Sequence, residues 1–374
     1  MAKIRHVLGI SGGKDSAALA LYLRRLYPDL EIDYYTSDTG RELDETYALI
    51  ERLKSALGKD ITEIKPIEEN NTNAESNFDH FLELYGGYLP SSMARWCTKK
   101  LKLEPFENYI GNEPTISYVG IRGDEDREGY ISKKSNVQSI FPFRENIWSE
   151  DVIKKILSNQ NIDQLVLLYE RAMEVKELEE ALHYISKPIN TSYTQKQKLE
   201  ALLRIGVKTF NQVVFQFLKT TDYPIGKLNS FPLIENEDII RLDDVFQILE
   251  ESGVGAPGYY NKLDYEVEID GENKKGVYAR SRSGCFFCFY QQKIEWVWLL
   301  EQHPQLFEKA KTYEIDGYTW MQEETLEELS QPERVIAIKK EHYLRTHREQ
   351  SKSDNNWQDD ILAAEGVGCA SCFI

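Results

Sequence analysis

Residues 11–16, with the sequence SGGKDS, are the part of the chain whose residue types and spacing most directly predict chemistry. Its two glycines let the backbone approach a ligand closely, and its serines and the first amides of a following helix can donate hydrogen bonds to anionic oxygens. The spacing is neither that of a Walker A loop nor that of a GxGxxG dinucleotide turn. The residues predicted to bind phosphate are Ser11, Gly12, Gly13, Lys14, Asp15 and Ser16. We expect Lys14 and Asp15 to lie in an exposed turn rather than in the core.

The cysteines form a second chemical pattern. Cys285 and Cys288 make one CxxC pair, Cys369 and Cys372 make another, and Cys97 stands alone. In a reducing compartment, such pairs indicate metal, cluster or sulfur chemistry rather than disulfides. A zinc site formed by the two CxxC pairs is one possible arrangement, although the long gap between the pairs is unusual for a zinc ribbon.

The elements that position these residues are predicted from hydrophobic periodicity. An apolar strand leads into the glycine turn, a helix follows over residues 17–26, and a second strand over residues 31–36 ends just before Asp38. Strands at residues 61–64 and 116–121 alternate with further helices. This alternation predicts a doubly wound, mostly parallel α/β sheet. Because ligands bind beyond the carboxyl ends of such strands, we expect Asp38 to lie where a nucleotide or its Mg²⁺ would sit.

Two similar segments suggest an insertion in this sheet domain. Residues 141–146 (FPFREN) are echoed by residues 231–236 (FPLIEN), and helical sequence lies between them. A coincidence between two short phrases is the alternative. The predicted division is a core at residues 1–148, a helical insertion at 149–230, a continuation of the core with CxxC at 231–300, a helical C-terminal region at 301–347, and a polar linker with a cysteine-containing tail at 348–374.

Composition limits the class of protein. The formal net charge of −17 argues against a chain whose whole surface binds nucleic acid, so that any polyanion must meet a local basic patch. No apolar run approaches the roughly 20 residues that span a bilayer, and the N-terminus does not read as a signal peptide. We therefore expect a cytoplasmic protein with no membrane contact.

Five motifs occur in an order that resembles the phosphoadenosine phosphosulfate (PAPS) reductase family of the PP-loop ATP pyrophosphatase superfamily. They are SGGKDS, SDTGRE at residues 37–42, RWCTKKLK at 95–102, GIRGDEDR at 120–127 and SRSGCFFC at 281–288. The order is most similar to the ATP-pyrophosphatase component of DNA phosphorothioation systems of the Dnd and Ssp type. The resemblance covers residues 4–130 and 231–300. It implies an adenine nucleotide alpha hydrolase-like fold, with ATP and Mg²⁺ as cofactors.

The resemblance also implies roles for individual residues. Catalytic candidates are Lys14, Asp15, Asp38 and Cys97, and Gly120 and Arg122 join the nucleotide-binding residues of the glycine turn. Candidates for binding an anionic acceptor are Arg95, Lys99, Lys100, Arg127 and Arg282. A basic stripe is also typical of an ordinary solvated face, and salt bridges to nearby acidic residues are an equally simple role for Arg122 and Arg127.

Family reductases with an iron–sulfur cluster have a cysteine pair before the basic segment and a later CxxC. This chain keeps only Cys97 of the first pair, with Trp96 in the other place, so the resemblance leaves Cys97, Cys285 and Cys288. Three thiolates can hold a [4Fe–4S] cluster with one iron open to an external sulfide. Zinc, or plain buried thiols, are the alternatives.

The function implied is ATP-dependent activation of an acceptor, with release of pyrophosphate, followed by sulfur transfer. By resemblance, the acceptor is a DNA backbone phosphate, and the partners are a cysteine desulfurase and other members of a modification complex. Cys369 and Cys372, on a tail with nearby glycines, are candidate sulfur carriers, whereas a tail that only plugs a groove is the alternative. Rival functions are sulfonucleotide (PAPS or APS) reduction, transfer RNA thiolation, and a non-catalytic nucleotide-binding scaffold.

Overall fold

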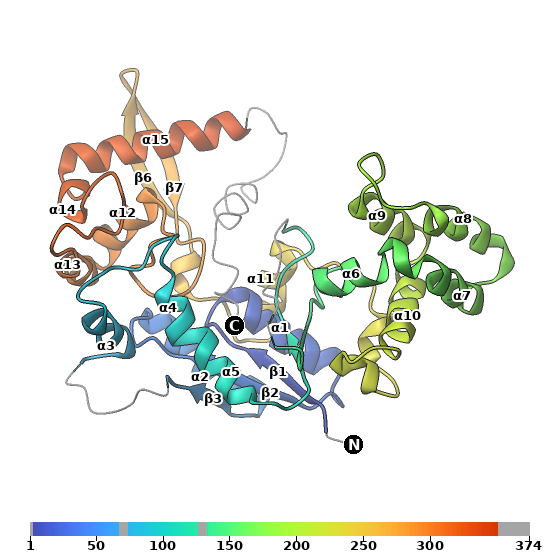
Figure 1. Cartoon of the computed structure of the whole chain (residues 1–374). Coiled ribbons are helices and arrows are strands. Elements are labelled where there is room, and N and C mark those ends of the chain that lie inside the picture. Colours follow the sequence, from blue (N-terminus) through green and yellow to red (C-terminus); the bar gives the residue numbers. More distant parts are fainter. Residues whose placement is uncertain (1–2, 67–73, 126–131, 133, 351–374) are drawn as a thin grey trace.

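The computed structural model describes residues 3–66, 74–125, 132 and 134–350. A sheet of five parallel strands forms its centre, in the order β3-β2-β1-β4-β5 (Figure 1). The strands are β1 (Arg5–Gly9), β2 (Ile32–Ser37), β3 (Ile61–Ile64), β4 (Thr115–Tyr118) and β5 (Val137–Ile140). His6 in β1 is in register with Ile32 on one side and with Ile116 on the other. The predicted parallel α/β fold is therefore confirmed, with β5 as a strand that the prediction missed.

The helices beside the sheet follow from their apolar faces. They are α1 (Lys14–Leu26), α2 (Asp44–Leu57), α3 (Asn77–Leu84), α4 (Trp96–Thr98) and α5 (Glu104–Ile110), and a π-helical turn, Lys99–Leu103, joins the last two. Leu19, Leu23 and Leu49 are fully buried in the largest hydrophobic core together with side chains of the sheet. The strand order reverses about β1, so the carboxyl ends of β1 and β4 mark the place where such sheets bind ligands.

A group of helices lies to one side of the sheet, on the right of Figure 1. It comprises α6 (Glu150–Ile156), α7 (Ile162–Ala172), α8 (Val175–Ser186), α9 (Gln195–Ile205) and α10 (Val207–Leu218), before α11 (Leu242–Glu251) packs on α1. Lys198 is fully buried here, and its ammonium donates to the carbonyls of Ile185 and Lys187 at 2.7 and 2.9 Å. Burial lowers the pKa of Lys198 to about 8. This lysine therefore satisfies carbonyls at the end of α8.

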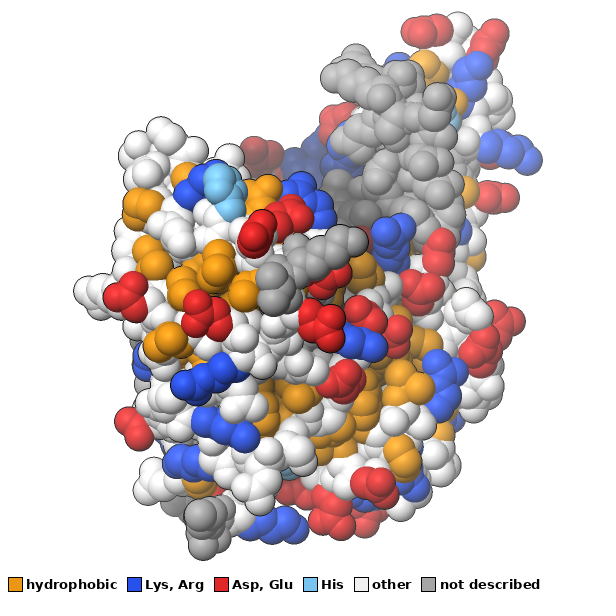
Figure 2. Space-filling model, turned by 90° about the vertical axis from the view of Figure 1, so that its right-hand side faces the viewer, with side chains coloured by type: hydrophobic (Ala, Val, Ile, Leu, Met, Phe, Trp, Pro, Cys, Tyr) orange, Lys and Arg blue, Asp and Glu red, His pale blue; other side chains and the backbone are white. Residues whose placement is uncertain are grey.

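The two similar segments, residues 141–146 and 231–236, lie side by side. The Asn236 amide donates to the carbonyl of Pro142 at 2.8 Å, and the amide of Ile240 donates to the carbonyl of Phe143 at 3.0 Å. The chain thus leaves the sheet domain and returns to it at neighbouring points. Seen from the side of these helices, basic and acidic side chains of the described residues are interspersed over the surface (Figure 2).

The C-terminal region contains an antiparallel hairpin, β6 (Leu263–Ile269) and β7 (Glu272–Tyr278), which the sequence analysis did not predict. Its helices are α12 (Lys293–Gln302), α13 (Pro304–Thr312), α14 (Leu326–Leu329) and α15 (Pro332–Gln350). The helix α15 lies across the hairpin (Figure 1). A second hydrophobic core, which contains Trp296, joins this region to α3 and to the residues around Trp96.

None of the helices in the described part of the chain combines the length and the apolar character needed to cross a membrane.

Substitutions at two glycines with positive φ, Gly12 and Gly58, would test how tightly α2 packs on the glycine turn. A Cβ at Gly12 (φ +70°) would lie 2.2 Å from Cγ2 of Thr46, whereas one at Gly58 (φ +61°) would meet nothing within 4 Å. We expect Gly58→Ala to lower the free energy of unfolding by about 1 kcal/mol. Gly12→Ala should lower it by at least about 2 kcal/mol more, because α2 must move. Urea denaturation measures both variants, and equal losses would contradict the close approach.

Candidate functional site

The glycine turn connects β1 to α1 at the carboxyl edge of the sheet. The hydroxyls of Ser11 and Ser16 lie 3.1 Å apart, and the Ser11 amide donates to the Ser16 hydroxyl at 3.2 Å. The turn is covered by residues that are distant in sequence. Tyr259 donates its hydroxyl hydrogen to the carbonyl of Gly12 at 3.2 Å. A Cβ at Gly13 would lie 2.4 Å from the hydroxyl oxygen of Ser283, so the serine would have to shift for any larger residue at this position.

The expectation that Lys14 and Asp15 lie in an exposed turn is wrong. Their exposed fractions are 1% and 5%, and Ser16 is also buried. The Lys14 ammonium lies 3.1 Å from the Asp15 carboxylate and 5.0 Å from the ring centroid of Tyr260. The reason for the burial is this cover of aromatic residues, which comes from a part of the chain more than 240 residues away. The Lys14 ammonium is therefore buried beside the turn in an ion pair with Asp15 and is not exposed to solvent.

Arg122 connects the glycine turn to the loop after β4. This fully buried guanidinium pairs with Asp15 at 2.7 Å, Asp124 at 2.9 Å and Glu125 at 3.0 Å. Burial raises the pKa of Asp15, but the charges of Lys14 and Arg122 outweigh this effect and leave the pKa lowered, so that Asp15 is ionised. Gly120 is also close, since a Cβ there would lie 2.9 Å from the carbonyl oxygen of Asp15. Salt bridges to carboxylates are thus the role that the structure shows for Arg122.

A pair of carboxylates lies beyond the end of β2. Tyr47 donates to Asp38 at 2.9 Å and contacts Glu42 at 3.1 Å, and the Thr39 hydroxyl donates to Glu42 at 2.7 Å. Burial, together with the neighbouring Asp38 carboxylate, raises the pKa of Glu42 to about 7. Such a pair attracts a cation, because a positive charge between the carboxylates would relieve their repulsion.

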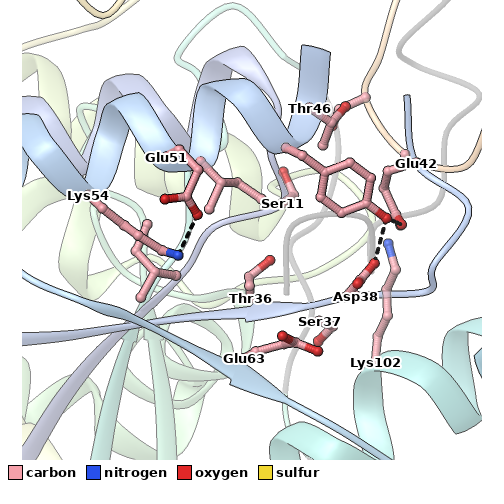
Figure 3. Close-up of a pocket in the computed structure, with 15 residues that line it drawn as sticks. Ser11, Thr36, Ser37, Asp38, Glu42, Thr46, Glu51, Lys54, Glu63 and Lys102 are labelled. Carbon is pink, nitrogen blue, oxygen red and sulfur yellow. Dashed lines mark hydrogen bonds and ion pairs between the residues drawn. The ribbon is translucent and has the colours of Figure 1, made fainter. Parts of the chain in front are cut away.

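These carboxylates border a cavity between β2, β3 and α2 (Figure 3). The Lys102 ammonium points toward Asp38 and Glu42 from the opposite side. The cavity is lined by Ser11, Thr36, Ser37, Asp38, Glu42, Thr46, Tyr47, Ile50, Glu51, Lys54, Ile61, Glu63, Lys102, Ser283 and Gly284. It therefore joins the glycine turn, the carboxylate pair and the cysteine segment in one site. Lys102 belongs to the basic segment that is expected to hold an anion near the nucleotide. Glu42, Tyr47 and Ser283 were not among the predicted site residues, although Glu42 stands within the SDTGRE motif and Ser283 within SRSGCFFC.

The first CxxC pair lies against this site. The amide of Phe286 donates to the carbonyl of Arg41 at 2.9 Å, and a β-bridge pairs Glu42 with Cys285. The Cys285 sulfur lies 3.1 Å from the Thr39 hydroxyl. Burial and then the charge of Glu42 raise the pKa of the Cys285 thiol well above its usual range. Burial likewise raises the pKa of Cys288. Both thiols are therefore protonated at neutral pH, which makes them weak nucleophiles as they stand.

Cys97 belongs to the same hydrophobic cluster as Cys285, and all three described cysteines are half-buried. The preceding Arg95 lies over the ring of Tyr290 at 5.3 Å, which brings the RWCTKKLK segment to the end of the CxxC loop. Within the described residues, however, no three His, Cys, Asp or Glu side chains are close enough to form a metal site. Cys369 and Cys372 lie outside the described residues. The iron–sulfur cluster and the zinc site both stay predictions.

The predicted anion-binding residues differ in their surroundings. Lys99 and Lys100 pair with Glu104 at 3.9 and 3.0 Å, and only Lys99 is largely exposed. Arg282 lies close enough to Cys288 for its charge to offset part of the burial effect on the thiol pKa. Arg127 lies outside the described residues. The role of Arg95, Lys99, Lys100, Arg127 and Arg282 in binding an anionic acceptor stays a prediction.

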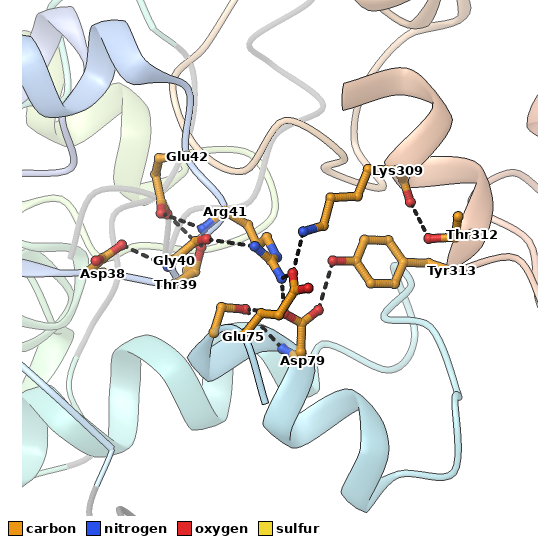
Figure 4. Close-up of polar contacts among 11 residues, drawn as sticks. Asp38, Thr39, Gly40, Arg41, Glu42, Glu75, Asp79, Lys309, Thr312 and Tyr313 are labelled. Atoms are coloured by element: carbon orange, nitrogen blue, oxygen red, sulfur yellow. Dashed lines mark hydrogen bonds and ion pairs between the residues drawn. The ribbon is translucent and has the colours of Figure 1, made fainter. Parts of the chain in front are cut away.

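Arg41 ties the site to the C-terminal region (Figure 4). It pairs with Asp79 and with Glu75, which in turn pairs with Lys309 of α13. The Tyr313 hydroxyl donates to Asp79 at 2.7 Å. The loop that carries Asp38 is therefore held between α3 and α13 by charged contacts.

The raised pKa of Glu42 predicts how stability depends on pH. A carboxyl whose folded pKa is above its unfolded value stabilises the fold at low pH, and this contribution is lost as pH rises from about 4.5 to about 7. Glu42→Gln should remove this loss and raise the free energy of unfolding at pH 8 by roughly 2 kcal/mol, with little change at pH 4.5. Chemical denaturation at both values tests it, with Glu177→Gln on the exposed face of α8 as control. Destabilisation at pH 8 would contradict this account.

Comparison with known proteins finds similarity over part of the chain. Residues 5–174 match the family model described as phosphoadenosine phosphosulfate reductase domain. An uncharacterized protein of Methanocaldococcus jannaschii is 31% identical over 149 residues, which make up 36% of this chain and 28% of that protein. The crystal structure of phosphoadenylyl-sulfate reductase from Candida auris, a phosphate complex, aligns with 39% of this chain and 66% of its own chain. Its 15% identity and TM-score of 0.29 are too low to establish a common fold.

The chain thus spans less than two thirds of the length of each of these proteins. The matched residues include the glycine turn, Asp38, Cys97 and Arg122, whereas the cysteine pair at 285 and 288 lies beyond them. Residues 5–174, which make up less than half of the chain, are thus similar to the phosphoadenosine phosphosulfate reductase domain family.

Proposed function

We propose that the protein is an ATP-dependent enzyme that adenylates an acceptor, releases pyrophosphate and enables sulfur transfer to that acceptor. The observation that carries this proposal is the contact between the cysteine segment and the phosphate-binding turn. Ser283 covers Gly13, and Cys285 contacts Thr39 beside the carboxylate pair. A nucleotide bound at the turn would therefore lie next to a loop that carries two thiols.

The nucleotide would be held by groups that the structure gathers at the end of β1. The first amides of α1 and the serine hydroxyls donate to phosphate oxygens, and the positive end of the helix dipole favours their charge. Lys14 would exchange its partner Asp15 for a phosphate, while Asp15 keeps its ion pair with Arg122. Such an exchange costs little, because neither buried charge is left without a partner.

Asp38 and Glu42 fit a divalent cation, since their carboxylates lie together and the pKa of Glu42 is raised to about 7. These two residues would hold Mg²⁺, which supplies positive charge to the phosphates of ATP. Lys102 faces the same carboxylates in Figure 3 and can contact a nucleotide in the cavity. Catalysis by this set would consist of positioning and charge stabilisation rather than of a strong base.

In this mechanism an acceptor oxygen attacks the α phosphorus of ATP and pyrophosphate leaves. The adenylated oxygen is then a good leaving group: the outer sulfur of a cysteine persulfide, charged by the sulfur donor, attacks the acceptor phosphorus and AMP leaves. A second thiol then forms a disulfide with the carrier cysteine and frees the thiophosphate. The high pKa of Cys285 means that the thiol needs a nearby positive group, or a sulfur donor that arrives already activated, before it can serve as the carrier. No step of this mechanism depends on an iron–sulfur cluster.

The acceptor that we propose is a DNA backbone phosphate, and the sulfur donor is a cysteine desulfurase within a modification complex. This part rests on the resemblance of the five motifs. The net charge of −17 requires DNA to meet a local basic surface. Arg95, Lys99 and Arg282 are the candidates nearest to the cysteines.

Sulfonucleotide reduction is a second candidate, and the match of residues 5–174 to the reductase domain family favours it. In that reaction the turn binds the phosphates of the sulfonucleotide and a thiol attacks its sulfur. The same cysteine loop beside the turn would serve this chemistry. Measured products separate the two: the proposed enzyme forms AMP and pyrophosphate, whereas a reductase forms sulfite.

Lys14→Ala tests the role of the turn. The variant loses a charged phosphate contact, and we expect ATP-dependent pyrophosphate release to fall on the order of a hundredfold. Lys154→Ala, at an exposed position of α6, is the matched control and should retain full turnover. Because Lys14 is buried, thermal unfolding must show that the variant is folded. A folded Lys14→Ala variant with normal turnover would rule out phosphate binding by this lysine.

A sulfur-labelling experiment tests the acceptor. The full-length protein is incubated anaerobically with ATP, DNA, a cysteine desulfurase and ³⁵S-cysteine, in parallel with transfer RNA in place of DNA. The proposal predicts label in the DNA backbone that depends on ATP. Label in transfer RNA alone would indicate thiolation of that RNA, and ATP cleavage without any labelled nucleic acid would contradict sulfur transfer to DNA.

A further inference from the structure

A cavity of about 470 Å³ lies between the start of α12 and the C-terminal half of α15, apart from the nucleotide site. It is lined by Gln291, Gln292, Lys293, Ile294, Met321, Ile338, Glu341, His342 and Arg345. All of these residues lie beyond the part of the chain that matches the reductase domain family. The proposed mechanism assigns no role to them.

The side chain of Gln291 is the main observation. It is 7% exposed, and within the described residues neither its amide nitrogen nor its amide oxygen has a hydrogen-bond partner. A buried carboxamide without partners lowers stability, so proteins rarely leave one in this state. Gln291 lines the cavity, and its buried carboxamide would have to turn toward a ligand there, which could then accept from the nitrogen and donate to the oxygen. The ligand must therefore present a donor and an acceptor side by side.

The walls of the cavity favour a flat, apolar body. Ile294 and Ile338 are buried, and Met321 lies beside them with a flexible thioether that adapts to a ring face. Burial lowers the pKa of His342 to about 4, so this ring is neutral at pH 7. Its Nδ1 lies 2.8 Å from the Tyr265 hydroxyl. The interior is thus uncharged, which excludes a fully ionised ligand from the depth of the cavity.

The mouth of the cavity carries charge. Arg345 is exposed and donates to the side-chain oxygen of Gln292 at 2.8 Å. Lys293 forms ion pairs with Glu323 and Glu324, and Glu341 forms an ion pair with Arg334 at 3.3 Å. Arg345 is therefore the cation best placed to meet a phosphate outside the cavity.

We propose that this cavity binds an unstacked adenine base of a single-stranded nucleic acid, with an adjacent phosphate at Arg345. A glutamine carboxamide complements the neighbouring donor and acceptor of adenine, N6 and N7, and apolar side chains contact the ring faces. The backbone amide of Gln291 donates to the backbone carbonyl of Cys288 at 2.8 Å, so a base held in the cavity lies beside the cysteine loop. The inference deepens the proposed function, since it rests on a nucleic acid as the acceptor.

The test is fluorescence anisotropy with a labelled short oligodeoxyadenylate and with an abasic strand of the same length. An excess of α,β-methylene-ATP keeps the probe out of the nucleotide site. Gln291→Leu removes the carboxamide, and Gln291→Met serves if the first variant does not fold. Gln247→Leu, on the exposed face of α11, is the matched control.

The proposal predicts that Gln291→Leu weakens binding of oligodeoxyadenylate roughly tenfold or more, while the control does not. The abasic strand should bind equally weakly to the wild type, the Gln291 variant and the Gln247→Leu control. Equal affinity of the wild type and the Gln291 variants for oligodeoxyadenylate would overturn the proposal, as would equal binding of the two probes to the wild type. Pyrophosphate release is measured in parallel, with ATP, Mg²⁺ and DNA as the acceptor. If the wild type released no pyrophosphate, the proposed function would be contradicted. The anisotropy measurements would still decide whether the cavity binds an adenine base.

Discussion

The buried guanidinium of Arg122 is the constraint on which the site depends. A buried charge needs partners, and Arg122 finds them in Asp15, Asp124 and Glu125. Asp15 fixes the glycine turn, and Asp124 accepts from the amide of Leu242 at 3.2 Å, at the start of α11. The charge of Arg122 thus joins the turn, the loop after β4 and the segment that returns from the helical insertion. Removing it would take a charged partner from carboxylates in two parts of the chain, Asp15 in the turn and Asp124 and Glu125 in the loop after β4.

The proposed nucleotide site is built from parts of the chain that lie far apart in the sequence. Tyr259 and Ser283 cover the glycine turn from the C-terminal side, and Arg41 holds the Asp38 loop to α13 through Glu75. A nucleotide bound in this site would therefore lie against the loop that carries Cys285 and Cys288. Such coupling suits an enzyme that must join adenylation to a sulfur step, because both reactions share the same acceptor.

Much of the fold could be predicted from the sequence, because the apolar strands and amphipathic helices of residues 4–121 follow regular periods. The hairpin of β6 and β7 could also have been found, since alternating residues flank Asp270 and Gly271, a strong hairpin turn signal. The burial of Lys14 could not, because the cover at Tyr260 is formed by residues far away in sequence. The role of Glu42 depends in the same way on contacts with Asp38 and Tyr47 that only the folded chain creates.

The central claim is that the glycine turn binds ATP so that the bond between its α and β phosphorus atoms is broken. Phosphorus NMR of ATP incubated anaerobically with the full-length protein, Mg²⁺, DNA and a sulfur donor measures this directly. The account predicts AMP and pyrophosphate in equal amounts. Formation of ADP and inorganic phosphate, or intact ATP under conditions in which the DNA gains sulfur, would contradict it.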